Sequence, residues 1–532
     1  MPGATHPIRT TPIANATASV PHTRKFAICT QPPSPVASEL TKLRHQLYPG
    51  RVASSTRKVA MKRGGPTTPQ RSRARARPNL LPWFRDGRPK GEGLAGFERH
   101  RQLRPKAIAS HDVRVIDTVI IGAGHAGLAV SKRLVDAGID HVVLERGDIA
   151  ETWRTQRWDS FALNTPSAVN RLPGGPPAVD PNEFLGRDAW IAELETYARQ
   201  SALPVRTRAT VTAVTADDHG GFVVTIGDDE MVRTRNVVVA TGAANVPKVP
   251  AAAATIDRRV EVLTTGTYRR PSQLRDGAIL VVGSAQSGGQ IAEDLVDAGR
   301  EVYLATGTVG RFPRRLRGRD TVAWLSESGW MAQRPQDLPD PAMMRAVQPL
   351  ISGVGPRGHT LSLQGLARRG VTLLGHFESA DGYRLRFAAD LAQHVRFGDE
   401  IAARIRQHVD DHIARRGIAA PPSEPDPADE PADPETFRSP TELDLADRGV
   451  RSVIFTTGFR ADYSWLRLPV VRSDGSVVHE QGRAPVDGLW FVGLLWLRMR
   501  KSGIILGAMD DSAHVAAQVA ARGVSHRPRA AT

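Results

Sequence analysis

The chain has 532 residues, and its 71 Lys and Arg against 55 Asp and Glu give a formal net charge of +16. This length exceeds one domain of ordinary size and suggests about three structural units. The single cysteine, Cys29, excludes a disulfide framework and a redox-active cysteine pair. The longest apolar stretch, Gly488–Leu497, is too short to span a bilayer, so we expect a cytoplasmic protein without a membrane segment.

The positive charge is concentrated in an N-terminal extension, residues 1–112. Residues 1–110 hold 21 Lys and Arg against 4 Asp and Glu, and the rest of the chain is nearly neutral. The extension mixes Pro, Ser, Thr, Arg and Gly without apolar periodicity, which predicts disorder. A transit peptide, a basic arm for nucleic acid or anionic lipid, and translated sequence upstream of the true start are the alternatives. We expect no nucleic-acid binding by the folded body.

A strand–turn–helix pattern begins at Thr118. A short apolar strand leads directly into Gly122-Ala-Gly124-His-Ala-Gly127, an amphipathic helix follows, and the next strand ends in Glu145. In such a dinucleotide fingerprint, the first glycine makes the turn, the second admits a pyrophosphate, and the third lets helix and strand pack closely. The acid accepts hydrogen bonds from a ribose diol. The spacing therefore predicts a dinucleotide site.

The same pattern recurs 161 residues later in the same register. Its turn contains Gly283, Ser284, Gln286, Ser287 and Gly288, with Ala285 in place of the middle glycine. We interpret that alanine as a tolerated departure that loosens the approach of a pyrophosphate. The duplication predicts a second dinucleotide site.

The residues after the second fingerprint indicate which dinucleotide it binds. Thr306 stands where the first unit has Glu145, and the loop beyond carries Arg311 and Arg314. A carboxylate would repel a 2′-phosphate, whereas a hydroxyl and guanidinium groups can bind one. The second site is therefore predicted to prefer NADPH over NADH. A solvated basic loop is the alternative interpretation of these arginines.

Two Thr-Gly turns, ending in Gly242 and Gly458, each follow a predicted strand and bracket the second unit. They predict an α/β fold with two Rossmann-like dinucleotide-binding domains, the second inserted in the first. A stretch rich in Pro, Asp and Glu is expected to be an exposed acidic connector. The predicted bounds are 113–271 for the first part of the first domain, 272–458 for the inserted domain with its connector 419–440, and 459–532 for the second part of the first domain.

Further motifs identify a family resemblance. They are Thr152-Trp153-Arg154, Arg157-Trp158-Asp159-Ser160-Phe161, Leu163-Asn164-Thr165-Pro166, Thr457-Gly458-Phe459 and Gly488-Leu-Trp-Phe-Val-Gly493. With both fingerprints, residues 113–525 resemble the flavoproteins with two dinucleotide domains. These include flavin-containing, Baeyer–Villiger and plant auxin-forming monooxygenases. The resemblance is strongest to a bacterial branch labelled flavoproteins involved in potassium transport.

The resemblance implies FAD in the first domain and NADPH in the inserted domain. It also implies oxygenation of a small organic substrate with O2 through a flavin C4a-hydroperoxide, and it leaves a homodimer open. Asn164 and Arg157 are the expected catalytic residues. Alternatively, Asn164 caps a local turn, and Trp153, which is expected along the flavin, is an aromatic residue of the core. The expected cofactor-binding residues are Gly122, Gly124, Gly127, Glu145, Arg146, Trp153, Asp159, Gly242, Gly283, Ser284, Gln286, Ser287, Gly288, Thr306, Arg311, Arg314 and Gly458.

Departures from the family pattern leave other functions open. The monooxygenase signature between the two units falls on residues 258–268, where only Tyr268 matches and Thr264 replaces the histidine. An NADPH-dependent flavin reductase or oxidase without productive oxygenation is therefore an alternative, and a redox sensor associated with ion transport is a third. No Ser/His/Asp arrangement or metal-ligand spacing is present in the sequence, so we expect neither hydrolytic chemistry nor a bound metal.

Overall fold

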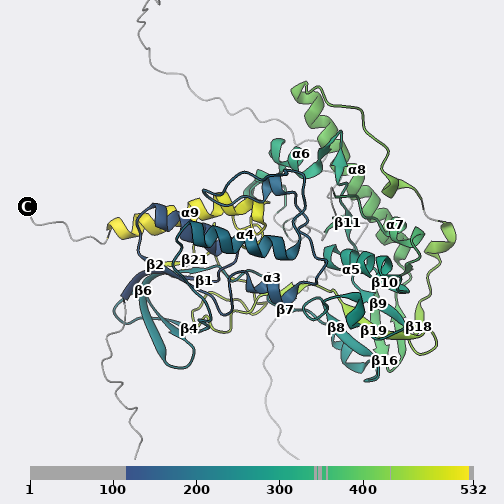
Figure 1. The fold of residues 1–532 in the computed structure, drawn as a ribbon, viewed down its shortest axis with the longest axis horizontal. Helices are drawn as coiled ribbons and strands as arrows, with labels where there is room; N and C mark the ends of the chain where they lie inside the picture. Colours follow the sequence, from purple (N-terminus) through teal and green to yellow (C-terminus); the bar gives the residue numbers. More distant parts are fainter. Residues whose placement is uncertain (1–114, 341–343, 345–349, 355–357, 432, 526–532) are drawn as a thin grey trace, which may run out of the picture. The chain divides into compact units, whose positions relative to one another are not determined.

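The computed structural model describes residues 115–340, 344, 350–354, 358–431 and 433–525. The predicted extension 1–112 and Cys29 lie outside the described residues. The described residues belong to one compact part of the chain, Pro105–Thr532. Two sheets with parallel strands organise them, and each contains one predicted strand–turn–helix unit (Figure 1).

The first sheet has seven strands, in the order β3-β2-β1-β6-β5-β4, with β21 paired to β6. The central strands run parallel and are almost wholly buried, as expected for a sheet covered on both faces. β4 and β5 form antiparallel hairpin pairs at one edge. The strands are β1 (Val115–Ile121), β2 (His141–Leu144), β3 (Val205–Arg206), β4 (Val211–Ala216), β5 (Phe222–Ile226), β6 (Glu230–Val239) and β21 (Leu489–Phe491).

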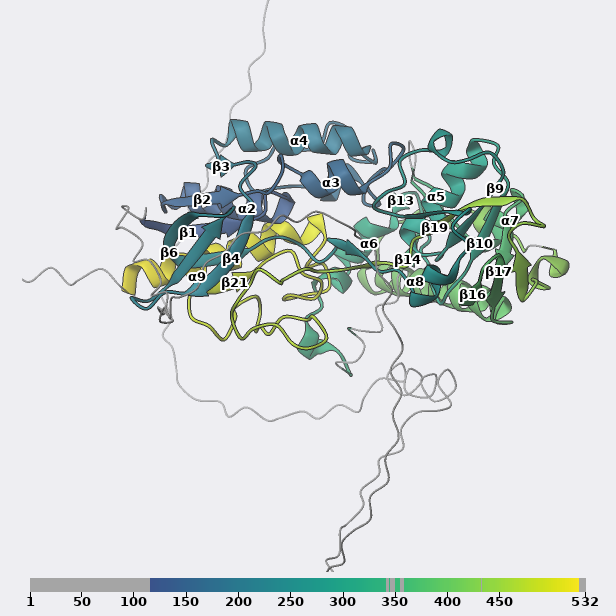
Figure 2. The same ribbon diagram turned by 90° about the horizontal axis from the view of Figure 1, so that it is seen from below.

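Helices α2, α4 and α9 pack with this sheet, and α2 contacts both of the others (Figure 2). The buried face of α2 contains Ala126, Ala129, Val130 and Leu134, as the apolar spacing predicts. β21 and α9 come from the C-terminal segment, so that segment completes the first sheet and its helical cover. The helices are α2 (His125–Asp136), α3 (Glu151–Gln156), α4 (Arg187–Gln200) and α9 (Ala508–Ser525).

The second sheet has five parallel strands in the order β15-β10-β9-β19-β8. Helix α5, which follows the second fingerprint, packs against β9 and β10 (Figure 2). β8 belongs to this sheet although it precedes position 272, because its apolar run pairs with β19. The elements are β8 (Glu261–Thr264), β9 (Ala278–Val282), α5 (Gln286–Asp297), β10 (Val302–Ala305), β15 (Thr372–Leu374) and β19 (Val450–Phe455).

The remaining elements lie in the chain between β10 and β19. The longest is α8, and Gly417, which follows its last residue, has φ +61°, a left-handed conformation that glycine adopts without strain. β16, β17 and β18 form a small antiparallel sheet. The elements are β11 (Gly310–Arg311), β12 (Arg315–Leu316), β13 (Arg319–Asp320), α6 (Thr321–Glu327), β14 (Leu350–Ile351), α7 (Leu363–Arg368), β16 (Phe377–Asp381), β17 (Arg384–Phe387), α8 (Leu391–Arg416) and β18 (Glu442–Asp444).

The chain passes between the two sheets through the two predicted Thr-Gly turns. Gly242 follows β6 with φ +72°, and Gly458 follows β19 with φ +91°. The next segments, β7 (Val246–Pro247) and β20 (Phe459–Arg460), pair antiparallel with each other. The outgoing and returning connections therefore form one two-stranded ribbon.

Candidate functional site

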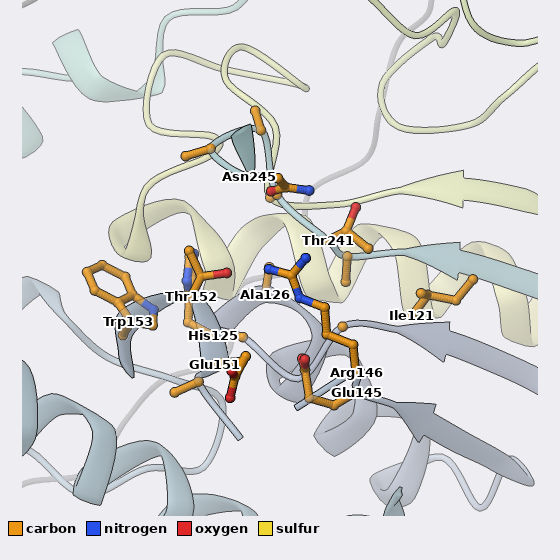
Figure 3. Close-up of a pocket in the computed structure, with 18 of the residues that line it drawn as sticks. Ile121, His125, Ala126, Glu145, Arg146, Glu151, Thr152, Trp153, Thr241 and Asn245 are labelled. Carbon is orange, nitrogen blue, oxygen red and sulfur yellow. The ribbon is translucent and has the colours of Figure 1, made fainter. Parts of the chain in front are cut away.

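A cavity of about 750 Å³ lies at the first fingerprint, where β1, β2 and β6 end. Pockets for organic ligands typically enclose about 300–1,000 Å³, so this one has the size of a cofactor site. Figure 3 shows Arg146, Trp153 and Thr241 among the side chains that line it. Eight predicted site residues line the cavity: Gly122, Gly124, Glu145, Arg146, Trp153, Arg157, Asn164 and Gly242.

The three glycines of the first turn meet different physical requirements. Gly122 has φ +106°, and a Cβ there would lie 2.8 Å from the carbonyl oxygen of Ala240. A Cβ on Gly127 would lie 2.0 Å from the carbonyl oxygen of Gly122, so only glycine lets helix and strand approach this closely. Gly124 lines the cavity and has open space where its Cβ would stand. The turn therefore has the backbone geometry that the fingerprint predicts.

Glu145 follows the last residue of β2 and is buried at the cavity wall. One carboxylate oxygen accepts a 2.7 Å hydrogen bond from the backbone N–H of Ala123, and the other accepts one of 3.2 Å from Gly147. These bonds fix the carboxylate against the fingerprint turn. It is thus oriented where the fingerprint places the acceptor for a ribose diol.

Two polar groups at this cavity were missed in the sequence. His125, the first residue of α2, lines it, and burial lowers the pKa of its imidazole to about 4. The buried hydroxyl of Thr241 lines it too and has no hydrogen-bond partner within the part of the chain described. A buried hydroxyl without a partner is costly, and a bound polar ligand can relieve that cost. Their positions in the sequence could have indicated them, because His125 lies within the fingerprint and Thr241 lies within the Thr-Gly turn.

Arg157 is held among aromatic rings at the cavity. Its guanidinium carbon lies 5.5 Å from the ring centre of Trp153, 5.8 Å from that of Phe161 and 5.4 Å from that of Phe459. Such stacking stabilises a cation, while burial lowers the pKa of Arg157 to about 10. Since Phe459 belongs to β20, this cluster joins the segment around α3 to the returning connection.

Asp159, predicted to lie along a flavin, is not among the residues that line the cavity. Its carboxylate pairs instead with Arg187 at 2.8 Å and with Arg270 at 3.1 Å. Arg187 begins α4 beside the first sheet, whereas Arg270 lies between β8 and β9 of the second. The two arginines therefore give Asp159 a role in holding these segments together.

Asn164 lies at the cavity wall and is exposed to it. Its backbone carbonyl accepts a 2.9 Å hydrogen bond from Nη1 of Arg314. Arg314 is only 2% exposed, and Asp320 lies 3.7 Å from its guanidinium. The structure therefore places Arg314 against a residue of the first cavity, rather than on the solvated loop considered as an alternative.

The second fingerprint repeats the backbone of the first. Gly283 has φ +106°, and a Cβ on Gly288 would lie 1.8 Å from the carbonyl oxygen of Gly283. Ser284 is buried and accepts a 3.1 Å hydrogen bond from the backbone N–H of Gly307. Ser287 is half-buried in the first turn of α5. The turn geometry expected from the repeated sequence is present.

The surroundings of the second turn differ from those of the first. A cavity of only about 10 Å³ lies there, lined among others by Ser284, Arg311, Gln364 and His394. This volume holds about one water molecule. This void is therefore too small to hold any part of a dinucleotide larger than a single atom group.

Two residues predicted to recognise a 2′-phosphate have partners within the protein. The hydroxyl of Thr306 donates to the carbonyl of Leu374 at 2.7 Å and lies 2.9 Å from Nδ1 of His394. Arg311 pairs with Asp399 at 2.8 Å and with Asp429 at 2.6 Å. Binding of a phosphate by Arg311 thus competes with two carboxylates.

The described residues of the acidic connector 419–440 are mostly exposed, and several of them contact the inserted segment. Asp429 pairs with Arg311 and, at 2.7 Å, with Arg406 of α8. The carboxylate of Asp426 accepts a 2.6 Å hydrogen bond from Thr360. Complementary charge therefore attaches the connector to the arginines near the second fingerprint.

In the segment 258–268, where the family has its monooxygenase signature, Thr264 and Tyr268 make hydrogen bonds within the protein. Thr264 ends β8, and its hydroxyl lies 3.4 Å from that of Thr267. Tyr268 is fully buried and donates a 2.6 Å hydrogen bond to Asp294 of α5. Ser160 donates to the other oxygen of that carboxylate at 2.7 Å, so Asp294 joins α5 to the segment after α3.

The described residues contain no helix that is long and apolar enough to cross a membrane. Within the same ranges, no group of three or more His, Cys, Asp or Glu side chains is arranged to hold a metal ion.

Known proteins similar to this chain include oxidoreductases. The family model described as pyridine nucleotide-disulphide oxidoreductase matches residues 119–328. An uncharacterized CzcO-like oxidoreductase of Geobacillus kaustophilus is 29% identical over 404 residues, 75% of this chain and 97% of the relative. The indole-3-pyruvate monooxygenase YUCCA1 of rice, Oryza sativa subsp. japonica, is 30% identical over 45% of this chain and 59% of its own length.

Solved structures agree at the level of the fold. A flavin-containing monooxygenase from Stenotrophomonas maltophilia aligns with a TM-score of 0.51 at 19% identity, covering 77% of this chain and all of that protein. Together with the duplicated fingerprints, these similarities identify the class of the protein. The chain is similar to flavoprotein monooxygenases with two dinucleotide-binding domains, and it is an oxidoreductase.

Proposed function

We propose that this protein is an FAD- and NADPH-dependent monooxygenase that oxygenates a small organic substrate with O2. FAD occupies the cavity at the first fingerprint, and NADPH binds at the second fingerprint, in a domain inserted in the FAD domain. The observation that carries the proposal is the cavity of about 750 Å³ that extends from the glycine turn to Asn164. A second fingerprint with the same backbone supports two dinucleotides.

The residues of the first cavity fit a flavin dinucleotide. Gly124 leaves open space beside the N-terminus of α2, where a pyrophosphate finds backbone N–H donors. Glu145 is oriented to accept from a ribose, and the unpartnered hydroxyl of Thr241 can bond to the ligand. When bound, FAD supplies the exchange of electrons between a reduced nicotinamide and oxygen.

The protein's own contribution is to orient the cofactor and to shape the reaction space. Trp153, Phe161 and Arg157 pack together at the cavity wall, and Arg157 carries a positive charge there. The side chain of Asn164 offers an amide donor and acceptor at the same cavity. We assign Asn164 and Arg157 to the reacting end of the flavin on this basis.

A reductase or oxidase that diverts the electrons is the second candidate. It is favoured by Thr264, which stands where the family signature has a histidine and whose hydroxyl contacts Thr267. Such an enzyme would consume NADPH and O2 and release hydrogen peroxide without oxygenating a substrate.

Stopped-flow mixing of the NADPH-reduced protein with oxygen separates the two candidates. A monooxygenase gives a long-lived absorbance band in the near ultraviolet before the flavin returns to its oxidised spectrum. An oxidase returns directly and releases one peroxide per NADPH consumed. Protein that is isolated colourless and takes up no FAD on reconstitution would contradict both.

A further inference from the structure

A chain of hydrogen bonds connects the second fingerprint to the first cavity. It begins at Gln286, the first residue of α5, whose amide nitrogen donates to the backbone carbonyl of Ser352 at 2.7 Å. The amide oxygen of Gln286 accepts from the backbone N–H of Ser352 at 3.1 Å and lies 3.2 Å from its hydroxyl. Gln286 therefore holds Ser352, which follows β14, in a fixed position.

The chain continues through Arg314. Its Nη2 lies 3.2 Å from the hydroxyl of Ser352, and its Nη1 donates to the backbone carbonyl of Asn164 at 2.9 Å. Asn164 lines the first cavity, whereas Gln286 lies in the second fingerprint. Three direct contacts thus join the two dinucleotide units through side chains.

The packing around Arg314 fixes its guanidinium in one place. The group lies 5.0 Å from the ring centre of Phe184 and 5.0 Å from that of Phe312. A Cβ on Gly358 would lie 2.7 Å from Cδ of Arg314, so the backbone there also closes over the side chain. This enclosure leaves little freedom to find other hydrogen-bond partners.

The chemistry of the site argues against a purely structural ion pair. Asp320 is 3.7 Å away, and one oxygen of that carboxylate has no hydrogen-bond partner among the described residues. Burying a cation without a close carboxylate is costly, and that burial lowers the pKa of Arg314. The two hydrogen bonds of the Arg314 guanidinium go to neutral groups. One is the carbonyl of Asn164 at the first cavity, and the other is the hydroxyl of Ser352 next to the second fingerprint.

We infer that Arg314 is a positioning residue that couples dinucleotide binding at the second fingerprint to the placement of Asn164 at the first cavity. This inference rests on the proposed function. A pyrophosphate at the N-terminus of α5 binds next to Gln286 and changes its contacts to Ser352. Ser352 and Arg314 transmit that change to the Asn164 carbonyl, because both are held by direct hydrogen bonds and close packing.

The test uses the FAD-loaded, full-length protein with NADP+ and NADPH as probes. Arg314→Met removes the donors at similar length, Arg314→Lys retains the charge, and Ser352→Ala removes the intermediate hydroxyl. Arg386→Met, on exposed β17, is the matched control because its arginine pairs only at the surface with Glu442 at 3.3 Å. We measure the flavin difference spectrum on NADP+ addition, the dissociation constant of NADP+, and the limiting rate of flavin reduction by NADPH.

For Arg314→Met we expect unchanged FAD content and a dissociation constant for NADP+ within about threefold of wild type. The difference spectrum should shrink at least fivefold and the limiting reduction rate should fall about tenfold, since the coupling is lost while the binding site persists. Arg314→Lys should retain part of the difference spectrum and part of the limiting reduction rate. Ser352→Ala should show the same pattern, and combining it with Arg314→Met should add nothing further.

A wild-type spectrum and reduction rate in Arg314→Met would overturn the inference, as would simple additivity of the two substitutions. If Arg314→Met fails to fold, Ser352→Ala gives the same decision alone, because it removes one oxygen only. Failure of the proposed function is visible separately: the wild-type protein itself would then bind no FAD or accept no electrons from NADPH.

Discussion

The two dinucleotide units share a turn but differ in what surrounds it. In both turns the first glycine has φ +106°, and in both the third glycine packs against the carbonyl of the first. Yet the cavity is about 750 Å³ at the first turn and about 10 Å³ at the second. The fingerprint thus determines local backbone geometry, while segments distant in sequence determine the space for a ligand.

The largest expected effect comes from substituting the third glycine of either turn. Gly127→Ala and Gly288→Ala each place a methyl about 2 Å from a backbone carbonyl oxygen, at 2.0 Å and 1.8 Å respectively. Backbone cannot yield cheaply there, so each variant should lose about 3 kcal/mol of unfolding free energy. Urea unfolding measures this. Gly124→Ala is the control, and equal stability of all three would refute the shared geometry.

A pH effect should distinguish the units, because His125 of the first corresponds to Gln286 of the second. Burial lowers the folded-state pKa of His125 from 6.5 to about 4, so the folded state favours the neutral imidazole. Above pH 6.5 the imidazole is neutral in both the folded and the unfolded state, so the free energy of unfolding is at its full value. As the pH falls from 6.5 towards 4, the unfolded state binds the proton more readily, and the free energy of unfolding falls. The loss should be about 1–3 kcal/mol.

Urea unfolding of the flavin-free protein at pH 7.5 and pH 4.5 measures this loss. His125→Gln, which gives the first unit the residue of the second, should remove most of the difference between the two pH values. An unchanged pH dependence in this variant would show that other groups cause it.

The middle position of the turn offers an exchange between the units. Gly124 and Ala285 have nearly the same backbone, with φ −82° and −73°. Gly124→Ala should therefore fold normally, but its methyl enters the proposed pyrophosphate site and should weaken FAD binding about tenfold, or ~1.4 kcal/mol. Ala285→Gly should strengthen NADP+ binding about threefold and leave FAD unaffected. Fluorescence titration measures both, and unchanged FAD affinity in Gly124→Ala would place the pyrophosphate elsewhere.

The smallest expected effect concerns the charges at the second unit. Asp429→Asn removes one of the two carboxylates that pair with Arg311, which should free the guanidinium for a 2′-phosphate. We expect 2′,5′-ADP to bind about fivefold more tightly and 5′-ADP to bind as before, by calorimetry. Asp433→Asn, elsewhere in the connector, is the control. If both nucleotides respond equally, Arg311 does not recognise the 2′-phosphate.

The sequence predicts those parts of the fold that depend on neighbouring residues. Gly122 and Gly127 could be assigned because the turn, strand and helix that require them are continuous in the chain. The contact of Arg314 with Asn164 could not be predicted from the sequence, because 150 residues separate the two and only the folded chain brings them together. Asp159 was placed at the flavin for its motif, whereas two arginines distant in sequence determine its actual position.

The polar groups of the first cavity show a second limit. His125 occupies a fingerprint position that tolerates many side chains, so the motif gives no sign of its burial. The burial of Thr241 is seen only in the folded chain, where its hydroxyl lies at the cavity without a hydrogen-bond partner among the described residues. The assignments of individual residues to FAD or NADPH stay predictions that the binding measurements above test.

The ribbon of β7 and β20 has a mechanical consequence. Val246 pairs with Arg460 and Pro247 with Phe459, so both covalent passages between the sheets cross at one place. Any swing of one sheet against the other must turn about this narrow crossing, and groups farther from it travel through longer arcs. In such a swing, side chains at the crossing, such as Phe459 against Arg157, would shift least and keep their separation, whereas groups farther from the crossing would move more.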